Sequence, residues 1–280
     1  MPQTYKLNNG LEIPSIGFGT WQTPDGDAAK IAVIEAIKAG YRHIDTAAIY
    51  RNEEGVGEGV LECGIPREEI FLTTKVWNKA RGYDLTMSSF ERSIEKLKTD
   101  HIDLLLIHWP ANAKQFDNWA EINSSTWKAM EELSEQGVLK AIGVSNFLTH
   151  HLESLFTKAN VKPVVNQIEF HPGFMQKEVV SFCKKEEIII EAWSPLGTGK
   201  LLQNETLKEI AEKNGASVAQ VCIKWALQHG TLPLPKSVTP GRIKENISLD
   251  DLNLLQKEMA KIDALPFIGG SGLNPDTVDF

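Results

Sequence analysis

Short apolar runs alternate with longer amphipathic stretches along this chain of 280 residues. Runs of about four to eight residues, bounded by turn residues, are typical of buried strands. Eight such runs occur, and we expect one strand in each: residues 15–19, 41–45, 70–75, 102–108, 139–144, 163–168, 188–193 and 232–236.

The stretches between these runs predict helices. Ile31, Ile34 and Ile37 recur at helical spacing in residues 27–39, and Gly40 then supplies a C-terminal stop. Further helices are expected at residues 83–98, 124–136, 148–158, 176–185 and 217–229. Two more, at 205–214 and 250–262, are additions to the alternating pattern.

The first residues have a different pattern. Residues 4–14 alternate between apolar and polar positions around Asn9-Gly10. Asn-Gly is the dipeptide most typical of a two-residue type I′ turn, so an antiparallel hairpin with that turn is predicted.

Eight strand–helix units predict an α/β fold, a (β/α)8 TIM barrel formed by residues 1–280 as a single domain. The hairpin would plug its N-terminal end. The alternative is an open doubly wound sheet, which would carry G-x-G-x-x-G between its first strand and helix. Gly17 and Gly19 are followed at the third position by Gln22, and Gly55 and Gly57 by Val60. Since the motif fails at both places, the barrel is favoured.

Net charge and cysteine content limit the possible partners and the cellular compartment of the protein. The net charge of −8 argues against a nucleic acid or an anionic membrane as partner. Cys63, Cys183 and Cys222 are far apart and form no C-x-x-C, which favours reduced core thiols. The first residues do not resemble a signal peptide, and no run of 18 apolar residues occurs. We therefore expect a soluble cytoplasmic protein, with a monomer as the default.

Polar or aromatic residues stand at the end of each predicted strand. In a (β/α)8 barrel the carboxyl ends of the strands converge on one mouth, where the chemistry sits. Singly, each has an ordinary explanation as a helix cap, an edge charge or core packing. Their coincidence on all eight strands indicates a site: Gly19, Thr20 and Trp21; Asp45 and Tyr50; Lys75; His108; Ser145 and Asn146; Gln167; Trp193 and Ser194; Lys236 and Ser237.

Four of these residues form a chemically coherent set. A desolvated Lys75 needs a carboxylate partner, and Asp45 lies on the neighbouring strand. The pKa of a free phenol is ~10, and an adjacent ammonium lowers it. Tyr50 is therefore predicted as a general acid tuned by Lys75, with His108 positioning a polar group of the substrate, and the acid is aimed at a carbonyl oxygen.

Several motifs resemble the aldo-keto reductase superfamily, over nearly the whole chain and in the right order. They are HIDTAAIY, TTKVW, IHWP, AIGVSNF, NQIEFHP and PKSVTPGRIKEN. The similarity is strongest to bacterial reductases of the 2,5-diketo-gluconate and glyoxal types. It implies a (β/α)8 barrel that uses NADPH to reduce aldehydes and ketones, whether small, aromatic or sugar-derived. Tyr50 would donate the proton, Lys75 and Asp45 would modulate it, and His108 would orient the carbonyl.

The same resemblance implies where NADPH lies. Ser145, Asn146 and Gln167 would bind the carboxamide, and Trp193, where many members have tyrosine, would stack on the ring. Thr239 and Pro240 begin a helix that favours an anion, with Lys236 and Arg242 on the 2′-phosphate and residues 197–201 across the pyrophosphate. The expected cofactor-binding residues are Gly19, Thr20, Trp21, Asp45, Ser145, Asn146, Gln167, Trp193, Ser194, Pro195, Leu196, Gly197, Lys236, Ser237, Val238, Thr239, Arg242, Glu245 and Asn246.

Trp21, Trp77 and Trp109 would wall a substrate pocket together with Tyr50 and His108, which favours an apolar or planar carbonyl compound. Residues 266–280 would border it. No metal is expected, because the remaining histidines show no shared face and no ligand spacing such as H-E-x-x-H. They are His43, His101, His150, His151, His171 and His229.

Two other functions remain open on the residues alone. Lys75 would suit a Schiff-base nucleophile in an aldolase-type barrel, although this leaves Ser145, Gln167 and Trp193 without a task. A non-catalytic NADP-binding sensor is the second, because cofactor binding does not require Tyr50 to act.

Overall fold

Eight parallel strands form the centre of the protein in a computed structural model that describes residues 3–268 and 270–280. They follow one another in chain order: β3 (Phe18–Gly19), β4 (His43–Asp45), β5 (Phe71–Val76), β6 (Ile102–Ile107), β7 (Leu139–Ser145), β8 (Val165–Glu169), β9 (Ile189–Trp193) and β10 (Leu232–Pro233). Gly17 N–H donates to Pro233 O at 3.1 Å and Gly19 N–H to Pro235 O at 3.0 Å, which joins the first strand to the last. The eight predicted strands and the barrel are confirmed.

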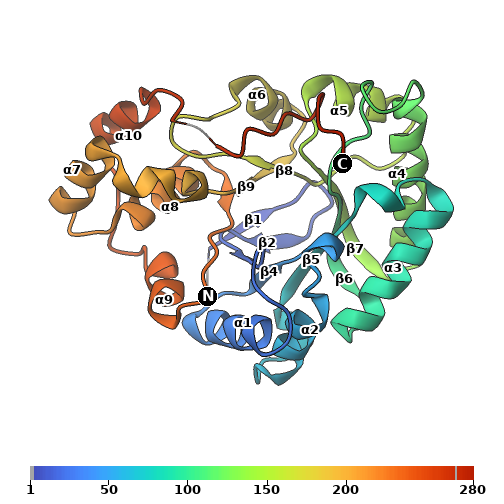
Figure 1. Ribbon diagram of the computed structural model, residues 1–280, viewed down its shortest axis with the longest axis horizontal. Coiled ribbons are helices and arrows are strands. Elements are labelled where there is room, and N and C mark those ends of the chain that lie inside the picture. Colours follow the sequence, from blue (N-terminus) through green and yellow to red (C-terminus); the bar gives the residue numbers. More distant parts are fainter. Residues whose placement is uncertain (1–2, 269) are drawn as a thin grey trace.

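Helices surround the strands (Figure 1). Those of the repeat are α1 (Asp27–Ala39), α2 (Glu53–Glu62), α3 (Tyr83–Leu97), α4 (Trp119–Glu135), α5 (Thr149–Phe156), α6 (Lys177–Lys185), α8 (Val218–Gln228) and α9 (Pro240–Ile247). The two additions are α7 (Glu205–Lys213) and α10 (Gln256–Asp263), which lie beside each other and are joined by the Lys213–Glu258 ion pair. Short 3-10 turns are η1 (Ala48–Tyr50), η2 (Arg67–Glu69), η3 (Asn78–Ala80) and η4 (Gly197–Gln203). No helix in residues 3–268 or 270–280 is both long and apolar enough to span a membrane.

Helix α2 is absent from the sequence-based expectation because its glycines disfavour a helix. They are needed for close packing. A Cβ on Gly55 would stand 2.6 Å from Gly26 O, and one on Gly57 would stand 2.6 Å from the backbone of Leu97. A Cβ on Gly59 would stand 2.7 Å from Val33 Cβ. The glycines thus let α2 lie directly against its neighbours.

Two helix boundaries also differ from expectation. Helix α4 begins at Trp119, before the predicted residue 124, and α10 begins at Gln256 rather than at 250. At α10 the start is fixed by a cap, because the Glu258 carboxylate accepts a 2.9 Å hydrogen bond from Leu255 N–H.

The N-terminal hairpin, β1 (Thr4–Lys6) and β2 (Glu12–Pro14), is confirmed, but the predicted turn type is wrong. Gly10 N–H donates to Leu7 O at 2.9 Å, and only Gly10 of the turn has a positive φ, of 91°. This is a type I turn followed by a left-handed glycine, whereas type I′ needs a positive φ at Asn9 as well. Leu7 and Ile13 pack into the barrel interior at its N-terminal end, which leaves the opposite mouth open.

Candidate active site

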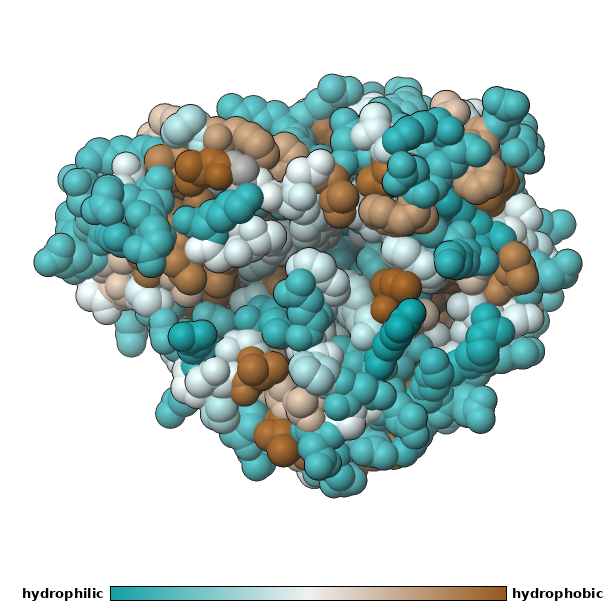
Figure 2. Space-filling view, viewed as in Figure 1, coloured by the Kyte–Doolittle hydropathy of each residue, from teal (hydrophilic) through white to brown (hydrophobic). Residues whose placement is uncertain are grey.

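A cavity of about 1020 Å³ opens at the carboxyl ends of the strands. The space-filling view is hollowed near its centre, inside the ring of helices (Figure 2). Most of the predicted cofactor and substrate residues line this cavity. The exceptions are Thr20, Gly197, Val238 and Thr239; Thr20 is buried and its hydroxyl donates to Asp45 O at 3.0 Å. Lys75 lies beneath the cavity and is buried.

Asp45 and Lys75 form a buried ion pair at the ends of β4 and β5. Lys75 Nζ donates to both carboxylate oxygens at 2.7 Å and to Thr46 O at 2.9 Å. Burial alone would lower the pKa of Lys75, but the charge and hydrogen bonds of Asp45, together with the neighbouring Tyr50 and Glu191, outweigh it and the pKa is raised. Lys75 is therefore a fixed cation whose ammonium hydrogens are all directed at oxygen atoms of the protein.

Tyr50 lies at the end of η1, directly above this pair. Lys75 Nζ donates to the Tyr50 hydroxyl at 3.5 Å and stands 5.1 Å from the centre of its ring. Burial raises the pKa of Tyr50, Lys75 lowers it and Asp45 raises it again, so the net pKa lies above 10.0. The lowering expected from Lys75 exists but is outweighed. Tyr50 is consequently a protonated phenol at neutral pH.

His108 follows β6 and faces Tyr50 across the same end of the cavity, with ring centres 5.6 Å apart in an edge-to-face arrangement. Trp77 packs edge-to-face on its other side at 5.2 Å. Burial and the charge of Lys75 hold the pKa of His108 well below 6.5. Its imidazole is therefore neutral, and its Nδ1 has no hydrogen-bond partner among the described residues.

A polar group of four residues occupies the opposite wall, at the ends of β7, β8 and β9. Asn146 Nδ2 donates to His108 O at 2.9 Å, and Asn146 Oδ1 accepts from the Trp193 indole at 2.9 Å. Ser145 Oγ donates to Gln167 O at 2.8 Å. Asn146 has a positive φ of 62°, which the short Asn side chain tolerates. These bonds hold the Trp193 ring in one orientation at the cavity wall.

Two cations line the cavity where β10 ends and α9 begins. Lys236 and Arg242 both line it, and within the described residues neither forms an ion pair with an acid. Partial burial lowers the pKa of Lys236. Helix α9 begins at Pro240 as predicted, but the Thr239 side chain makes no capping hydrogen bond. The first amides of α9 are therefore left for an anion, as are the two cations.

Several lining residues are not among those predicted from the sequence: Gln22, Ile49, Leu202, Ser217, Val218, Ala219, Leu234 and Pro235. Ser271, Leu273 and Phe280 also line the cavity and belong to the segment 266–280 that was expected to border it. Phe280 stacks on Trp77 at 5.6 Å and meets Trp109 edge-to-face at 5.5 Å. The expectation that residues 266–280 border the pocket is therefore confirmed, and they supply an aromatic side chain to it. The sequence offers only the aromatic residue type as a hint to the role of Phe280, because the hydrophobic periodicity does not extend to this segment.

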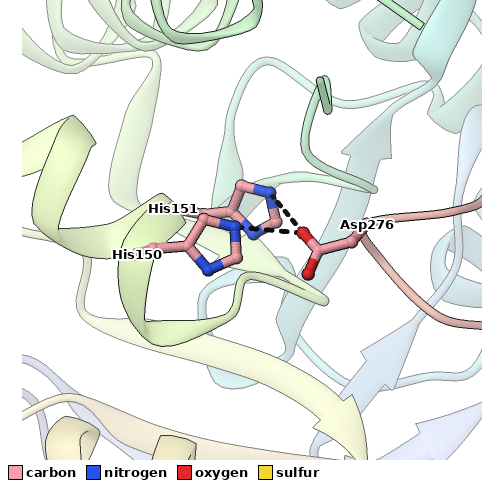
Figure 3. Close-up of side chains that lie close together, drawn as sticks. All are labelled: His150, His151 and Asp276. Carbon is pink, nitrogen blue, oxygen red and sulfur yellow. Dashed lines mark ion pairs between the residues drawn. The ribbon is translucent and has the colours of Figure 1, made fainter. Parts of the chain in front are cut away.

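A second cluster lies outside the cavity, where α5 meets the C-terminal segment (Figure 3). His150 Nε2 lies 3.0 Å and His151 Nε2 lies 3.4 Å from Asp276 Oδ1. The expectation that these histidines share no face was wrong. His151 Nδ1 accepts a hydrogen bond from Leu148 N–H at 3.2 Å, which leaves the proton on Nε2, where a metal would have to bind. The two imidazoles are therefore better placed to hold the Asp276 carboxylate of the C-terminal segment than to bind a metal ion.

The mouth of this (β/α)8 barrel holds an acid–lysine–tyrosine–histidine cluster beside a large cavity that two cations line. This is the architecture of a dinucleotide-dependent barrel enzyme. Residues 15–266 match the model of the aldo/keto reductase family. The chain is 51% identical over 280 residues to the glyoxal reductase of Bacillus subtilis (strain 168), covering 100% of this chain and 99% of that protein.

Solved structures agree with this result. The aldo/keto reductase from Brucella melitensis superposes with a TM-score of 0.89 at 49% identity, covering 94% of this chain and 97% of that one. A variant of Gox0644 in complex with NADPH superposes with a TM-score of 0.91 at 42% identity, covering 100% of both chains. The chain belongs to the aldo/keto reductase family, and it is an NADPH-dependent oxidoreductase.

The residues of the cavity fit this cofactor. Amide side chains lie beside the acid–lysine–tyrosine–histidine cluster, with Asn146 bonded to His108 O and Gln167 to Asp45, and the cations Lys236 and Arg242 line the same cavity, as a carboxamide and phosphates require. The Schiff-base alternative does not fit, since Lys75 is buried, does not reach the cavity and has no free ammonium hydrogen.

Proposed function

We propose that this enzyme reduces aldehydes and ketones to alcohols, with small dicarbonyl aldehydes such as glyoxal among its substrates, and that Tyr50 donates the proton. The observation that carries the proposal is the Tyr50 hydroxyl held 3.5 Å from Lys75 Nζ at the cavity surface. The identity to a glyoxal reductase supports the substrate class.

The roles follow from the geometry of the four residues. NADPH, when bound, supplies the hydride. Tyr50 is protonated at neutral pH and can give its proton to the oxygen of a carbonyl group that accepts the hydride. Lys75 stabilises the phenolate left behind, and Asp45 keeps Lys75 charged and in place. His108, as a neutral imidazole, donates an N–H to the same oxygen without competing as an acid.

We assign the cofactor contacts as the family resemblance suggests. Ser145, Asn146 and Gln167 would bind the carboxamide, and Trp193 would stack on the nicotinamide ring. Lys236, Arg242 and the start of α9 would hold the 2′-phosphate, which distinguishes NADPH from NADH.

The substrate end is aromatic on one side and polar at its base. Trp77, Trp109 and Phe280 form a packed wall, whereas Trp21 is exposed at the rim. Such a wall excludes water from the reacting carbonyl and accepts planar groups. We also propose that the enzyme is a cytoplasmic monomer; its three free thiols suit a reducing compartment.

The test is turnover of methylglyoxal, 4-nitrobenzaldehyde and a keto-sugar, followed by the loss of NADPH absorbance. We expect all three to be reduced, with the small aldehydes fastest and NADPH preferred to NADH. If the protein binds NADPH but oxidises it with none of these compounds, the proposal is wrong and a sensor role is favoured.

A further inference from the structure

Glu191 is a buried carboxyl group in the barrel interior that does not itself line the cavity. It lies on β9 two residues before Trp193, so both side chains point to the same side of the strand. Glu191 is fully buried and pairs in register with Gln167 on β8. A buried carboxyl group is costly unless its contacts compensate, which makes those contacts informative.

Gln167 connects Glu191 to the active site. Its Nε2 donates to Glu191 Oε2 at 2.7 Å and to Asp45 Oδ2 at 2.9 Å. Both partners are carboxyl oxygens, so the atom facing them is the amide nitrogen, and its two hydrogens are both used. The other amide atom, Oε1, is left as an acceptor for a ligand in the cavity that Gln167 lines. A continuous hydrogen-bonded chain therefore runs from Glu191 through Gln167, Asp45 and Lys75 to Tyr50.

We propose that Glu191 is a positioning residue that acts through Gln167, fixing its amide for the nicotinamide carboxamide, and that ionisation of Glu191 shifts the cofactor preference from NADPH toward NADP+. The first part follows from the two hydrogen bonds on Gln167 Nε2. The second follows from charge, because the oxidised nicotinamide is a cation and the reduced ring is neutral. A negative charge at Glu191 favours the cation.

The groups around Glu191 determine when that charge exists. Burial and the negative charge of Asp45 raise the pKa of Glu191 to about 8, against a lowering by Gln167 and Lys75. Glu191 Oε1 has no hydrogen-bond partner in the described part of the chain and faces His43 Nε2 at 3.8 Å. Burial lowers the pKa of His43 to about 3, so His43 is neutral. Glu191 is thus uncharged at pH 7 and becomes an anion as the pH rises.

The test compares wild type with Glu191→Gln and Glu191→Leu. Gln keeps an acceptor for Gln167 without the charge, and Leu removes the acceptor. Dissociation constants for NADPH and NADP+ are measured by fluorescence quenching between about pH 6.5 and pH 9.5. The phosphates titrate alike in both forms of the cofactor, so the ratio of the two constants removes their contribution.

In wild type we expect the ratio of the NADP+ to the NADPH dissociation constant to fall by about three- to tenfold as pH rises through about 8. In Glu191→Gln the ratio should stay flat, with NADPH affinity at low pH close to wild type. In Glu191→Leu NADPH affinity should fall by about three- to tenfold at every pH, because Gln167 is held by Asp45 alone.

An unchanged pH dependence in Glu191→Gln would show that another group titrates, and wild-type NADPH affinity in Glu191→Leu would show that Glu191 has only a packing role. If the Leu variant does not fold, the Gln variant still decides the charge effect. The readout is binding, so a failure to reduce carbonyl compounds would leave this inference intact.

Discussion

The Asp45–Lys75 pair gives a quantitative prediction, because breaking a buried pair costs more than removing it. Lys75→Met leaves the Asp45 carboxylate without a cation in a place that is nearly closed to water. Both side chains are nearly inaccessible, with relative exposures of 3% for Asp45 and 1% for Lys75. Losing one partner of such a pair typically costs about 3–5 kcal/mol.

The structure reduces this cost slightly. Gln167 Nε2 still donates to Asp45 at 2.9 Å, and one such bond recovers about 1 kcal/mol. The net loss is then about 2–4 kcal/mol, and at roughly 2–3 °C per kcal/mol for a chain of this size Tm falls by about 4–12 °C. Asp45→Asn combined with Lys75→Met removes both charges and should restore most of the lost stability, to within about 1 kcal/mol of wild type.

The assay is thermal unfolding of wild type, Lys75→Met and the double variant, with carbonyl reduction measured on each. Activity should stay at least about a hundredfold low in both variants, because Tyr50 has lost the cation that stabilises its phenolate. The reasoning is refuted if Lys75→Met is no less stable than the double variant, or if the double variant regains activity.

Three further predictions follow from single features. Arg242→Ala should raise the NADPH dissociation constant about tenfold and leave NADH binding unchanged, as titrations with both cofactors would show; equal losses for both would contradict a 2′-phosphate contact. The pKa of His108 lies well below 6.5 and that of Tyr50 above 10.0. The kcat should therefore show no histidine inflection between about pH 5.5 and pH 8, and it should fall only above about pH 10, where the proton donor Tyr50 loses its proton. A pH–rate profile with a midpoint near 6.5 would contradict this expectation. Gly57→Ala should destabilise by about 1–3 kcal/mol, because its Cβ would meet the Leu97 backbone at 2.6 Å; unchanged thermal unfolding would mean that α2 shifts without cost.

Strand positions and strand-end residues could be predicted because both rest on local signals. Apolar runs mark strands, and the parallel strands of a barrel end at one mouth, so the barrel pattern by itself predicts that Asp45, Lys75 and His108 lie together. The segment 53–62 was missed because glycine usually opposes a helix, and only the packing partners of Gly57 explain it. Packing between helices that are far apart in the sequence does not alter the hydrophobic periodicity, so the sequence pattern does not reveal it.

Residues that reach the site from other parts of the chain were the hardest to predict. Phe280 reaches the pocket only because the C-terminal segment is held along the mouth, with Asn112 Nδ2 donating to Pro275 O at 2.9 Å and to Val278 O at 3.0 Å. Glu191 lies within an apolar run, and the run by itself predicts only a strand. The signal for it was available, since a lone acid in such a run, two residues before Trp193, must point into the barrel beside that indole.

The most direct measurement of the central claim is the turnover of Tyr50→Phe, with NADPH binding determined on the same preparation. We predict an NADPH dissociation constant within about threefold of wild type and a loss of carbonyl reduction of about a hundredfold or more, since the phenyl ring keeps the packing and lacks the proton. Tyr83→Phe, which alters a tyrosine on α3 whose hydroxyl bonds Glu132 away from the cavity, is the matched control and should stay fully active. Wild-type turnover in Tyr50→Phe would contradict the account.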